Sequence, residues 1–132
     1  MKPIIKWQGG KRKELPHIRP FIPDNISNIA EPFCGGAAVA FDNEGIAYLN
    51  DNNRHLINLY TVLQSSEHFD QMLADVDKAK AKPERLEELF YYSRDIVNTY
   101  DFSDPYKAAF AFLVLRQQCF SVMERYNRQG VF

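Results

Sequence analysis

An aspartate that follows a strand-like segment is the side chain of this sequence best suited to bind a small polar ligand. Asp51 comes directly after the apolar residues 45–49 and Asn50. An ionised carboxylate only accepts hydrogen bonds, and its two oxygens can each accept one from a cis-diol. In nucleotide-binding α/β folds an acidic residue at the end of the second strand binds the ribose hydroxyls in this way. The sequence therefore predicts that Asp51 binds the ribose of an adenosine-type ligand.

A glycine-rich stretch upstream predicts the other side of this site. Residues 29–39 run from a short apolar segment through Glu31-Pro32-Phe33 to Gly35-Gly36 and then to small side chains. This order is typical of a strand, a tight turn and a helix, here over residues 36–41, whose first backbone N–H groups face a ligand. The glycine spacing does not fit the dinucleotide pattern, which needs three glycines. An adenosine-type ligand without a pyrophosphate is favoured, and S-adenosyl-L-methionine is the first candidate.

A second glycine pair lies near the N-terminus, after a short extended segment. Residues 4–8 precede Gly9-Gly10, and a basic helix is expected to begin at Lys11. Trp7 offers a flat ring and one N–H donor, and Lys11 offers a cation. A second interpretation is that Trp7 is buried beside a turn and that residues 11–13 form a solvated helix face. From these residues alone the second interpretation is the better supported.

Helical periodicity accounts for most of the remaining chain. Helices are expected over residues 11–21, interrupted by Pro16, and over residues 53–63, 69–79, 83–100 and 108–114 or beyond. Asn53 and Asp104-Pro105 are suited to begin two of these helices as N-caps. The sequence thus indicates an incomplete α/β sheet followed by a helical segment. A parallel sheet of two or three strands leaves an edge exposed, which predicts marginal stability or association.

Composition limits the classes of protein and of partner. The 132 residues make one ordinary domain, and a net charge of −1 leaves any contact with DNA to a local patch. Cys34 and Cys119 are isolated and the histidines are scattered, so the pattern suggests neither a metal site nor a nucleophile–base pair. The sequence shows no signal peptide and no apolar run of the roughly 20 residues that a membrane helix needs. We therefore expect a reduced, cytoplasmic protein that binds neither a metal nor a membrane.

Three motifs in register resemble the N-terminal part of the Dam-type DNA adenine-N6 methyltransferases, which depend on S-adenosylmethionine. They are residues 6–11 (KWQGGK), 31–36 (EPFCGG) and 49–53 (LNDNN), in the family's order and spacing. Residues 104–115 and 125–132 resemble the helix and loop that carry the family's target recognition. The resemblance implies an α/β fold in which a partial Rossmann-like methyltransferase sheet is followed by a helical target-recognition segment.

The resemblance also divides the chain by role. Residues 1–63 would form the S-adenosylmethionine-binding part of the methyltransferase domain, and residues 64–132 a partial, helical DNA target-recognition segment. The implied cofactor-binding residues are Trp7, Lys11, Phe33, Cys34, Gly35 and Asp51, and the implied DNA-binding residues are Arg125, Tyr126, Asn127 and Arg128. Double-stranded DNA is the implied partner and restriction-modification the implied setting.

The physical chemistry of the C-terminal residues agrees with this assignment. Arginine can pair with guanine and asparagine with adenine, and an aromatic ring can wedge between base steps. Without the resemblance, Tyr126 would be interpreted as a surface aromatic of a polar loop. Ser121-Val122 departs from the family, which usually has an Asn-Gly pair at this place, and the departure affects the detailed DNA contacts.

The family's catalytic motif, Asp or Asn followed by Pro-Pro and an aromatic residue, is absent from these 132 residues. In the family this motif accepts hydrogen bonds from the adenine amino group and stacks on the flipped base. Asp104-Pro105-Tyr106 lacks the second proline, and helix capping explains it. The sequence therefore assigns no catalytic residue.

The hypothesis favoured by the sequence is a fragment of a site-specific DNA adenine-N6 methyltransferase. It predicts that the 132-residue chain alone does not transfer methyl groups, and it implies the C-terminal half of the enzyme as a further partner. An alternative is a non-catalytic truncated relative that binds S-adenosylmethionine or a partner polypeptide. A third hypothesis is an unrelated α/β domain with a chance glycine loop, in which Asp51 binds no ligand.

Overall fold

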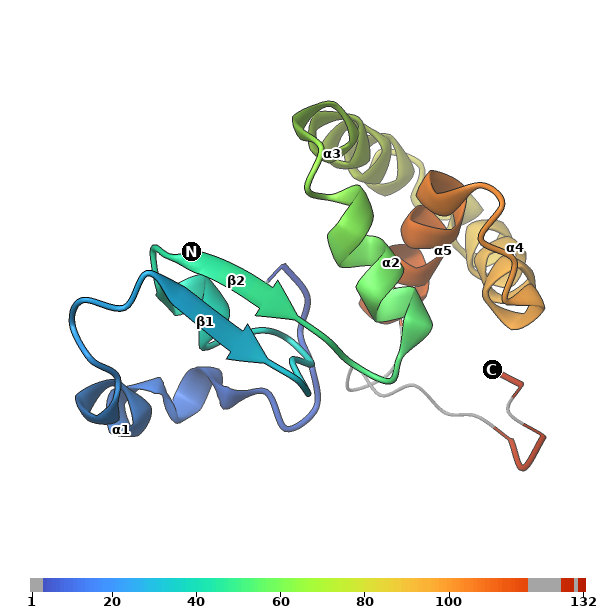
Figure 1. Cartoon of the computed structure of the whole chain (residues 1–132). Helices are drawn as coiled ribbons and strands as arrows, with labels where there is room; N and C mark the ends of the chain where they lie inside the picture. The colour runs from blue at the N-terminus through green and yellow to red at the C-terminus, as the bar shows by residue number, and fades with distance from the viewer. Residues whose placement is uncertain (1–3, 119–126, 130) are drawn as a thin grey trace. The chain divides into compact units, whose positions relative to one another are not determined.

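The computed structural model describes residues 4–118, 127–129 and 131–132. The chain divides into two compact units, of which Met1–Asn52 contains the two strands and Asn53–Phe132 is helical (Figure 1). The chain thus combines a small parallel sheet with helices, in the order that the sequence predicts. The division after residue 63 that the resemblance implies separates a cofactor-binding segment from a DNA-recognition segment. This division by role stays a prediction.

The sheet of the first unit pairs β1 (Asn28–Glu31) with β2 (Ile46–Leu49) in parallel. Both strands lie within segments that are apolar in the sequence and bounded by turn residues. Their last residues, Glu31 and Leu49, lie opposite each other. The two carboxyl ends therefore reach the same edge of the sheet, and the loops that follow them start side by side.

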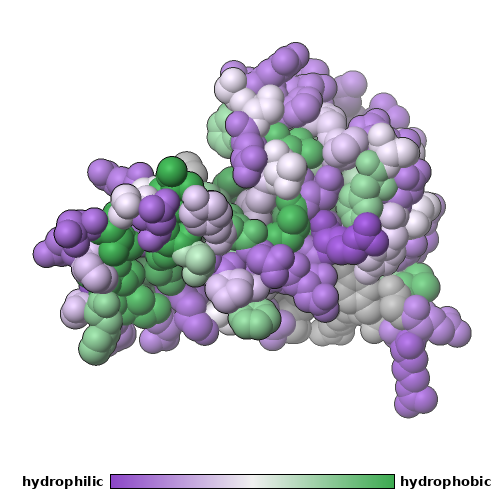
Figure 2. Space-filling model, viewed as in Figure 1, coloured by the Kyte–Doolittle hydropathy of each residue, from purple (hydrophilic) through white to green (hydrophobic). Residues whose placement is uncertain are grey.

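One face of β2 carries exposed apolar side chains. Ile46 and Tyr48 are 62% and 61% exposed, and side chains two residues apart share a face of a strand. Hydrophobic surface accordingly gathers over the strands in the space-filling view (Figure 2). Ile46 and Tyr48 therefore form an exposed apolar pair, and contiguous exposed apolar surface is typical of interaction sites.

Short helical pieces surround the sheet. The helix expected over residues 11–21 is broken into η1 (Lys11–Lys13), α1 (Leu15–Ile18) and η2 (Arg19–Phe21). A proline stands in the first turn of both α1 and η2, and proline lacks the N–H that would continue the preceding helix. Arg19 connects η2 with η3 (Ala40–Asp42) through two hydrogen bonds of 2.6 Å to the Asp42 carboxylate.

The prediction of a helix over residues 36–41 is wrong. The structure has turns there, followed by η3. Gly35 and Ala37 have φ angles of 46° and 50°, in the left-handed region, so a right-handed helix cannot begin at these residues. The Ala37 N–H closes a turn instead, with a 2.6 Å hydrogen bond to the carbonyl of Cys34. A run of small residues is compatible with either structure, and the sequence pattern does not distinguish them.

The second unit consists of helices in its described residues. They are α2 (Arg54–Val62), α3 (Ser66–Lys80), η4 (Pro83–Arg85), α4 (Leu86–Thr99) and α5 (Pro105–Gln118). Of these, α2, α3 and α5 begin after a residue whose side chain caps them. Oδ1 of Asn53 accepts a hydrogen bond of 3.0 Å from the Leu56 N–H, and Oδ1 of Asp104 accepts one of 2.9 Å from the Lys107 N–H. Both N-cap predictions are confirmed. Among the described helices, none combines the length and the apolar character needed to cross a membrane.

The core of the second unit forms around α5. Both α2 and α4 pack against this helix (Figure 1), and its residues 111–116 are all buried. The ring of His55 on α2 lies 4.7 Å from that of Tyr100, 5.0 Å from that of Phe102 and 5.7 Å from that of Phe112. An aromatic cluster therefore joins α2, α5 and the connection between α4 and α5.

Candidate functional site

Asp51 and the glycine turn meet at the carboxyl end of the sheet. The backbone N–H of Gly35 donates a 2.9 Å hydrogen bond to Oδ2 of Asp51. The strand pairing brings them together, because the Asn50 N–H donates to the Glu31 carbonyl at 2.9 Å and the Cys34 N–H donates to the Asn50 carbonyl at 2.8 Å. The ladder of β1 and β2 thus continues past its last paired residues into the loops. The structure therefore brings together the glycine turn and the segment that ends at Asp51, which are the two segments predicted to form the site.

The indole of Trp7 packs directly on the glycine turn. A Cβ at Gly35 would lie 2.6 Å from Cδ1 and 2.8 Å from Nε1 of this ring, and a Cβ at Gly36 would lie 3.1 Å from Cβ of Trp7. Gly35 also has a φ of 46°, which residues with a side chain rarely adopt. Both facts require glycine at position 35. The N-terminal motif and the glycine motif therefore form one structure, in which Trp7 is half-buried.

A cavity of about 420 Å³ lies beside Trp7 in the first unit. Its lining combines glycine backbone, small side chains and three cations: Ile5, Lys6, Trp7, Gly9, Gly10, Arg12, Lys13, Gly36 and Ala38. A volume of this size is within the range of small-molecule sites, roughly 300–1,000 Å³. Lys11 is not a lining residue, and its Nζ donates a 3.1 Å hydrogen bond to the Gly9 carbonyl. Positive charge beside Trp7 comes from Lys6, Arg12 and Lys13, none of which the sequence singles out as a cofactor-binding residue.

The Glu31 carboxylate accepts a hydrogen bond from the other end of the same loop, at Ala40. The sequence does not single out Glu31 as a site residue. Its Oε1 accepts a 2.6 Å hydrogen bond from the backbone N–H of Ala40, at the start of η3. Burial raises the pKa of this carboxyl, and the Ala40 N–H opposes part of the rise. Glu31 and Asp51 thus hold the loop at Ala40 and at Gly35. The signal in the sequence for this role of Glu31 is a carboxylate shortly before a glycine turn, because the buried backbone N–H groups of such a turn need hydrogen-bond acceptors.

The other predicted residues of the loop differ in exposure. Phe33 is 86% exposed, whereas Cys34 is buried. Burial raises the pKa of the Cys34 thiol to about 11, and the carboxylates of Asp51 and Glu31 add to the rise. The thiol therefore stays protonated at neutral pH and is a poor nucleophile. In the described part of the chain no metal-like group of three or more His, Cys, Asp or Glu gathers. The loop is suited to binding a ligand and holds no group suited to attack one.

The predicted DNA-binding residues fall near the C-terminus. Arg125 and Tyr126 lie outside the described residues. The Asn127 side chain forms a turn, because its Oδ1 accepts hydrogen bonds of 2.9 and 3.0 Å from two backbone N–H groups that follow it. Arg128 is exposed within this turn. The roles of all four residues in DNA binding stay predictions.

Comparison with known proteins identifies the family. Residues 7–132 match the model of the D12 class N6 adenine-specific DNA methyltransferases. The type II methyltransferase M.CviBI of Paramecium bursaria Chlorella virus NC1A is 36% identical over 100% of this chain and 48% of its own length. The DNA N-6-adenine-methyltransferase of Escherichia phage P1 is 37% identical over 98% of this chain and 17% of its own length. The DNA adenine methylase of Serratia marcescens is 34% identical over 98% of this chain and 46% of its own length.

The match extends over nearly the whole chain. The chain spans about half the length of two of these relatives and a smaller share of the third. The matched residues include Trp7, Gly35 and Asp51, so the loop geometry described above lies in the region shared with the family. The chain therefore belongs to the D12 class of N6 adenine-specific DNA methyltransferases.

Proposed function

We propose that this chain is the S-adenosylmethionine-binding part, together with part of the target-recognition segment, of a site-specific DNA adenine-N6 methyltransferase. The whole enzyme would transfer a methyl group from S-adenosylmethionine to the amino group of adenine. The observation that carries the proposal is the hydrogen bond from Gly35 to Asp51 at the carboxyl ends of β1 and β2. Trp7, packed on the same turn, adds the N-terminal motif to this site.

The residues of the first unit suit S-adenosylmethionine in three respects. A carboxylate can accept about four hydrogen bonds, so the bond from Gly35 does not exhaust the capacity of Asp51 to accept from a ribose diol. Phe33 presents an exposed ring beside the same loop, and an aromatic ring of this kind can pack on adenine. The basic lining beside Trp7 suits the carboxylate of the methionine part, with Lys11 next to it. The bound cofactor would supply the methyl group.

The proposal extends to the fold and the partners. In it, β1 and β2 belong to a partial Rossmann-like sheet, and residues 1–63 bind the cofactor. Residues 64–132 contact double-stranded DNA, with Arg125, Tyr126, Asn127 and Arg128 against the target duplex. The C-terminal half that the family carries would add the catalytic motif. The chain would work in the cytoplasm, on the DNA of the cell.

Trp7 makes a direct test possible, because it is the only tryptophan among the 132 residues. Titration of the chain with S-adenosylmethionine should change the fluorescence of Trp7 and release or absorb heat in calorimetry, with one site per chain. ATP, which carries phosphates in place of the methionine, is the matched control and should bind much more weakly. The absence of a saturable signal by both methods would overturn the proposal.

A second candidate is a non-catalytic relative that binds S-adenosylmethionine or a partner polypeptide. The exposed pair Ile46 and Tyr48 favours it, because an apolar strand face suits burial by another chain. The intact mass of the native gene product distinguishes the two candidates. A mass of 15.3 kDa supports the second candidate, and a larger product that contains Asp-Pro-Pro-aromatic supports the enzyme. Methyl transfer to duplex DNA by the 132-residue chain alone would contradict both.

A further inference from the structure

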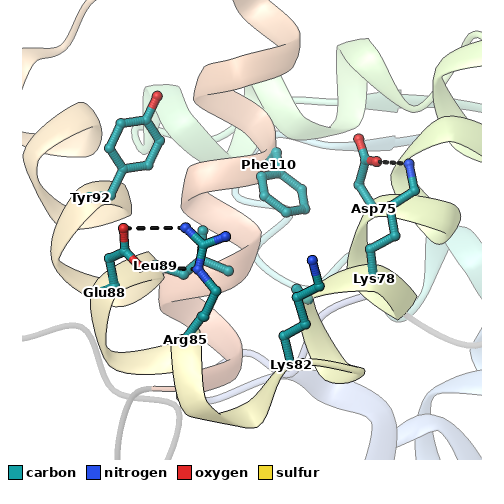
Figure 3. Close-up of a pocket in the computed structure, with 9 residues that line it drawn as sticks. Asp75, Lys78, Lys82, Arg85, Glu88, Leu89, Tyr92 and Phe110 are labelled. Atoms are coloured by element: carbon teal, nitrogen blue, oxygen red, sulfur yellow. Dashed lines mark hydrogen bonds and ion pairs between the residues drawn. The ribbon is translucent and has the colours of Figure 1, made fainter.

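A cavity of about 590 Å³ lies wholly within the second unit. It is formed by the C-terminal half of α3, η4, the first half of α4 and one turn of α5 (Figure 3). The volume is within the range of small-molecule sites, roughly 300–1,000 Å³. The cleft lies in the segment that the proposed function assigns to DNA recognition, but none of its lining residues belongs to the cofactor loop or to the four residues named there as contacting the target duplex.

The floor of this cleft is apolar and contains an aromatic ring. Phe110 of α5 is half-buried, whereas Ala109 and Ala111 on either side are 0% and 1% exposed. Leu89 of α4 is half-buried as well, and Tyr92 lies one turn further along that helix. The close-up shows the Phe110 ring between the side chains from α3 and those from α4 (Figure 3). A flat apolar surface is therefore accessible at the bottom of the cleft.

The rim of the cleft is charged, and its charges do not cancel. Asp75 pairs with Lys78 at 3.0 Å, and Glu88 pairs with Arg85 at 3.1 Å (Figure 3). Lys82 forms no ion pair with the residues that the structure describes, and its ammonium group points toward the centre of the cleft (Figure 3). The cleft thus carries one positive charge in excess, although the chain as a whole has a net charge of −1.

We propose that this cleft binds a nucleotide, with the base against Phe110 and Leu89 and the phosphate at Lys82. A purely apolar ligand would make no contact of opposite charge with the exposed Lys82 ammonium, and a small inorganic anion would leave the aromatic floor uncovered. A planar base that carries a phosphate satisfies both features. Sequence-tolerant nucleic-acid sites combine aromatic rings with cations in the same way. The nucleotide can come from the free pool or from a single strand of DNA, which present the same chemistry to the cleft.

The test is a titration of the full 132-residue chain with thymidine 5′-monophosphate, followed by amide chemical shifts in NMR. Shifts should concentrate in residues 78–92 and around Phe110. Thymidine without phosphate and inorganic phosphate without a base should each bind more weakly than the monophosphate. Equal affinity for either of these two compounds would overturn the proposal. A 5′-phosphorylated oligothymidylate then separates the sources: tighter binding per nucleotide indicates a DNA strand, and equal binding indicates the free nucleotide.

Two variants and a matched control make the test residue-specific. Lys82→Glu should weaken binding of the monophosphate by about fivefold or more, because it replaces the attraction of one cation by repulsion. Phe110→Leu should weaken it as well, since it keeps apolar volume and removes the ring. Lys80→Glu is the control, because Lys80 is exposed at the end of α3, two residues before Lys82, and is not a lining residue. An equal loss in Lys80→Glu and Lys82→Glu would mean non-specific charge attraction and would overturn the proposal, even if Phe110→Leu fails to fold.

Discussion

The phenolic hydroxyl of Tyr106 donates a 2.9 Å hydrogen bond to Oδ2 of Asp75, and this bond joins the first turn of α5 to α3. Nζ of Lys78 donates to Oδ1 of the same carboxylate at 3.0 Å. The hydrogen bond from Lys78, followed by that from Tyr106, holds the pKa of Asp75 below its usual value. Burial, followed by the bond to Asp75, raises the pKa of Tyr106 to about 12. The position of α3 against α5 is therefore coupled to the ionisation of Asp75.

The first prediction concerns acid sensitivity. A carboxyl whose pKa is lowered by folding stabilises the native state above its unfolded pKa, and this stabilisation is lost as the pH falls through the folded pKa. The free energy of unfolding should therefore fall below about pH 4, in part through Asp75. Tyr106→Phe should lower the free energy of unfolding at pH 7 by about 1 kcal/mol and should make the fall in acid shallower. Urea denaturation at pH 7 and at pH 3 measures both effects.

The matched control for this prediction is Tyr91→Phe. Tyr91 is 47% exposed on α4, and its hydroxyl makes no hydrogen bond that the described residues reveal. Its removal should leave both the stability at pH 7 and the acid dependence unchanged. If Tyr106→Phe and Tyr91→Phe have the same pH dependence, the hydrogen bond to Asp75 does not couple α3 to the ionisation of this carboxyl.

The second prediction concerns the glycine turn. Gly9 and Gly35 both have positive φ angles, of 71° and 46°, and a side chain in this conformation costs about 1–2 kcal/mol. A Cβ at Gly9 would meet no atom within 4 Å, whereas a Cβ at Gly35 would overlap the Trp7 ring. Gly35→Ala should therefore lose about 1–3 kcal/mol more stability than Gly9→Ala. It should also shift the Trp7 emission to longer wavelength, since the displaced ring would meet water.

Urea denaturation followed by Trp7 fluorescence measures both parts of this prediction in one experiment. Gly9→Ala is the control that isolates the backbone cost from the overlap with the ring. An equal loss of stability in the two variants, with unchanged emission in Gly35→Ala, would show that Trp7 does not press on the turn in solution.

The parts of the fold that the sequence predicted depend on local signals. The N-caps Asn53 and Asp104 act on N–H groups three residues away, and both were visible in the chain. The strands likewise follow from short apolar segments between turn residues. The meeting of Asp51 and Gly35 was predictable because parallel strands bring their carboxyl ends to one edge of a sheet.

The parts that could not be predicted depend on contacts between distant residues. Trp7 was expected either near a ligand or beside a local turn, but its ring covers a turn at Gly35, far along the chain. Ala37 has a left-handed conformation in the turn that the Gly35–Asp51 bond joins to β2, and no local signal in the sequence marks it. Of the three basic residues of η1, Arg12 and Lys13 line the cavity whereas Lys11 bonds the Gly9 carbonyl, and the charge pattern of the sequence does not distinguish them.

The third prediction concerns Asp51. Asp51→Ala removes the acceptor of the Gly35 N–H and, in the proposed function, the acceptor of the ribose hydroxyls. The affinity for S-adenosylmethionine should fall about 10- to 100-fold, because a hydrogen bond to a charged group contributes roughly 1.5–3 kcal/mol. Asp51→Asn keeps one acceptor oxygen and should fall between wild type and Asp51→Ala. Calorimetric titration of the three chains measures the series.

Asp42→Ala is the control for the Asp51 series, since Asp42 is a carboxylate of the same unit that pairs with Arg19 instead of the glycine turn. Removal of the Asp42 carboxylate should leave the affinity for S-adenosylmethionine within about twofold of wild type, because the loss of an exposed ion pair has only a small effect on free energy. Unchanged binding in Asp51→Ala would favour the hypothesis of a chance glycine loop and remove Asp51 from the site.

The fourth prediction separates binding from stability at Phe33. Phe33 and Phe21 are 86% and 87% exposed in the same unit, so truncating either to alanine should change the free energy of unfolding by no more than about 0.5 kcal/mol. Only Phe33 lies in the loop of Gly35 and Asp51. Phe33→Ala should therefore weaken S-adenosylmethionine binding by about two- to tenfold, the effect of losing a ring contact of roughly 0.5–1.5 kcal/mol, while Phe21→Ala should bind normally. Calorimetry at one temperature and urea denaturation of both variants measure the two quantities independently.

Two outcomes would contradict this prediction. Equal affinities of the two variants for S-adenosylmethionine would place the adenine away from Phe33. A large loss of stability in Phe33→Ala would mean that the Phe33 ring is packed in solution rather than exposed beside the loop.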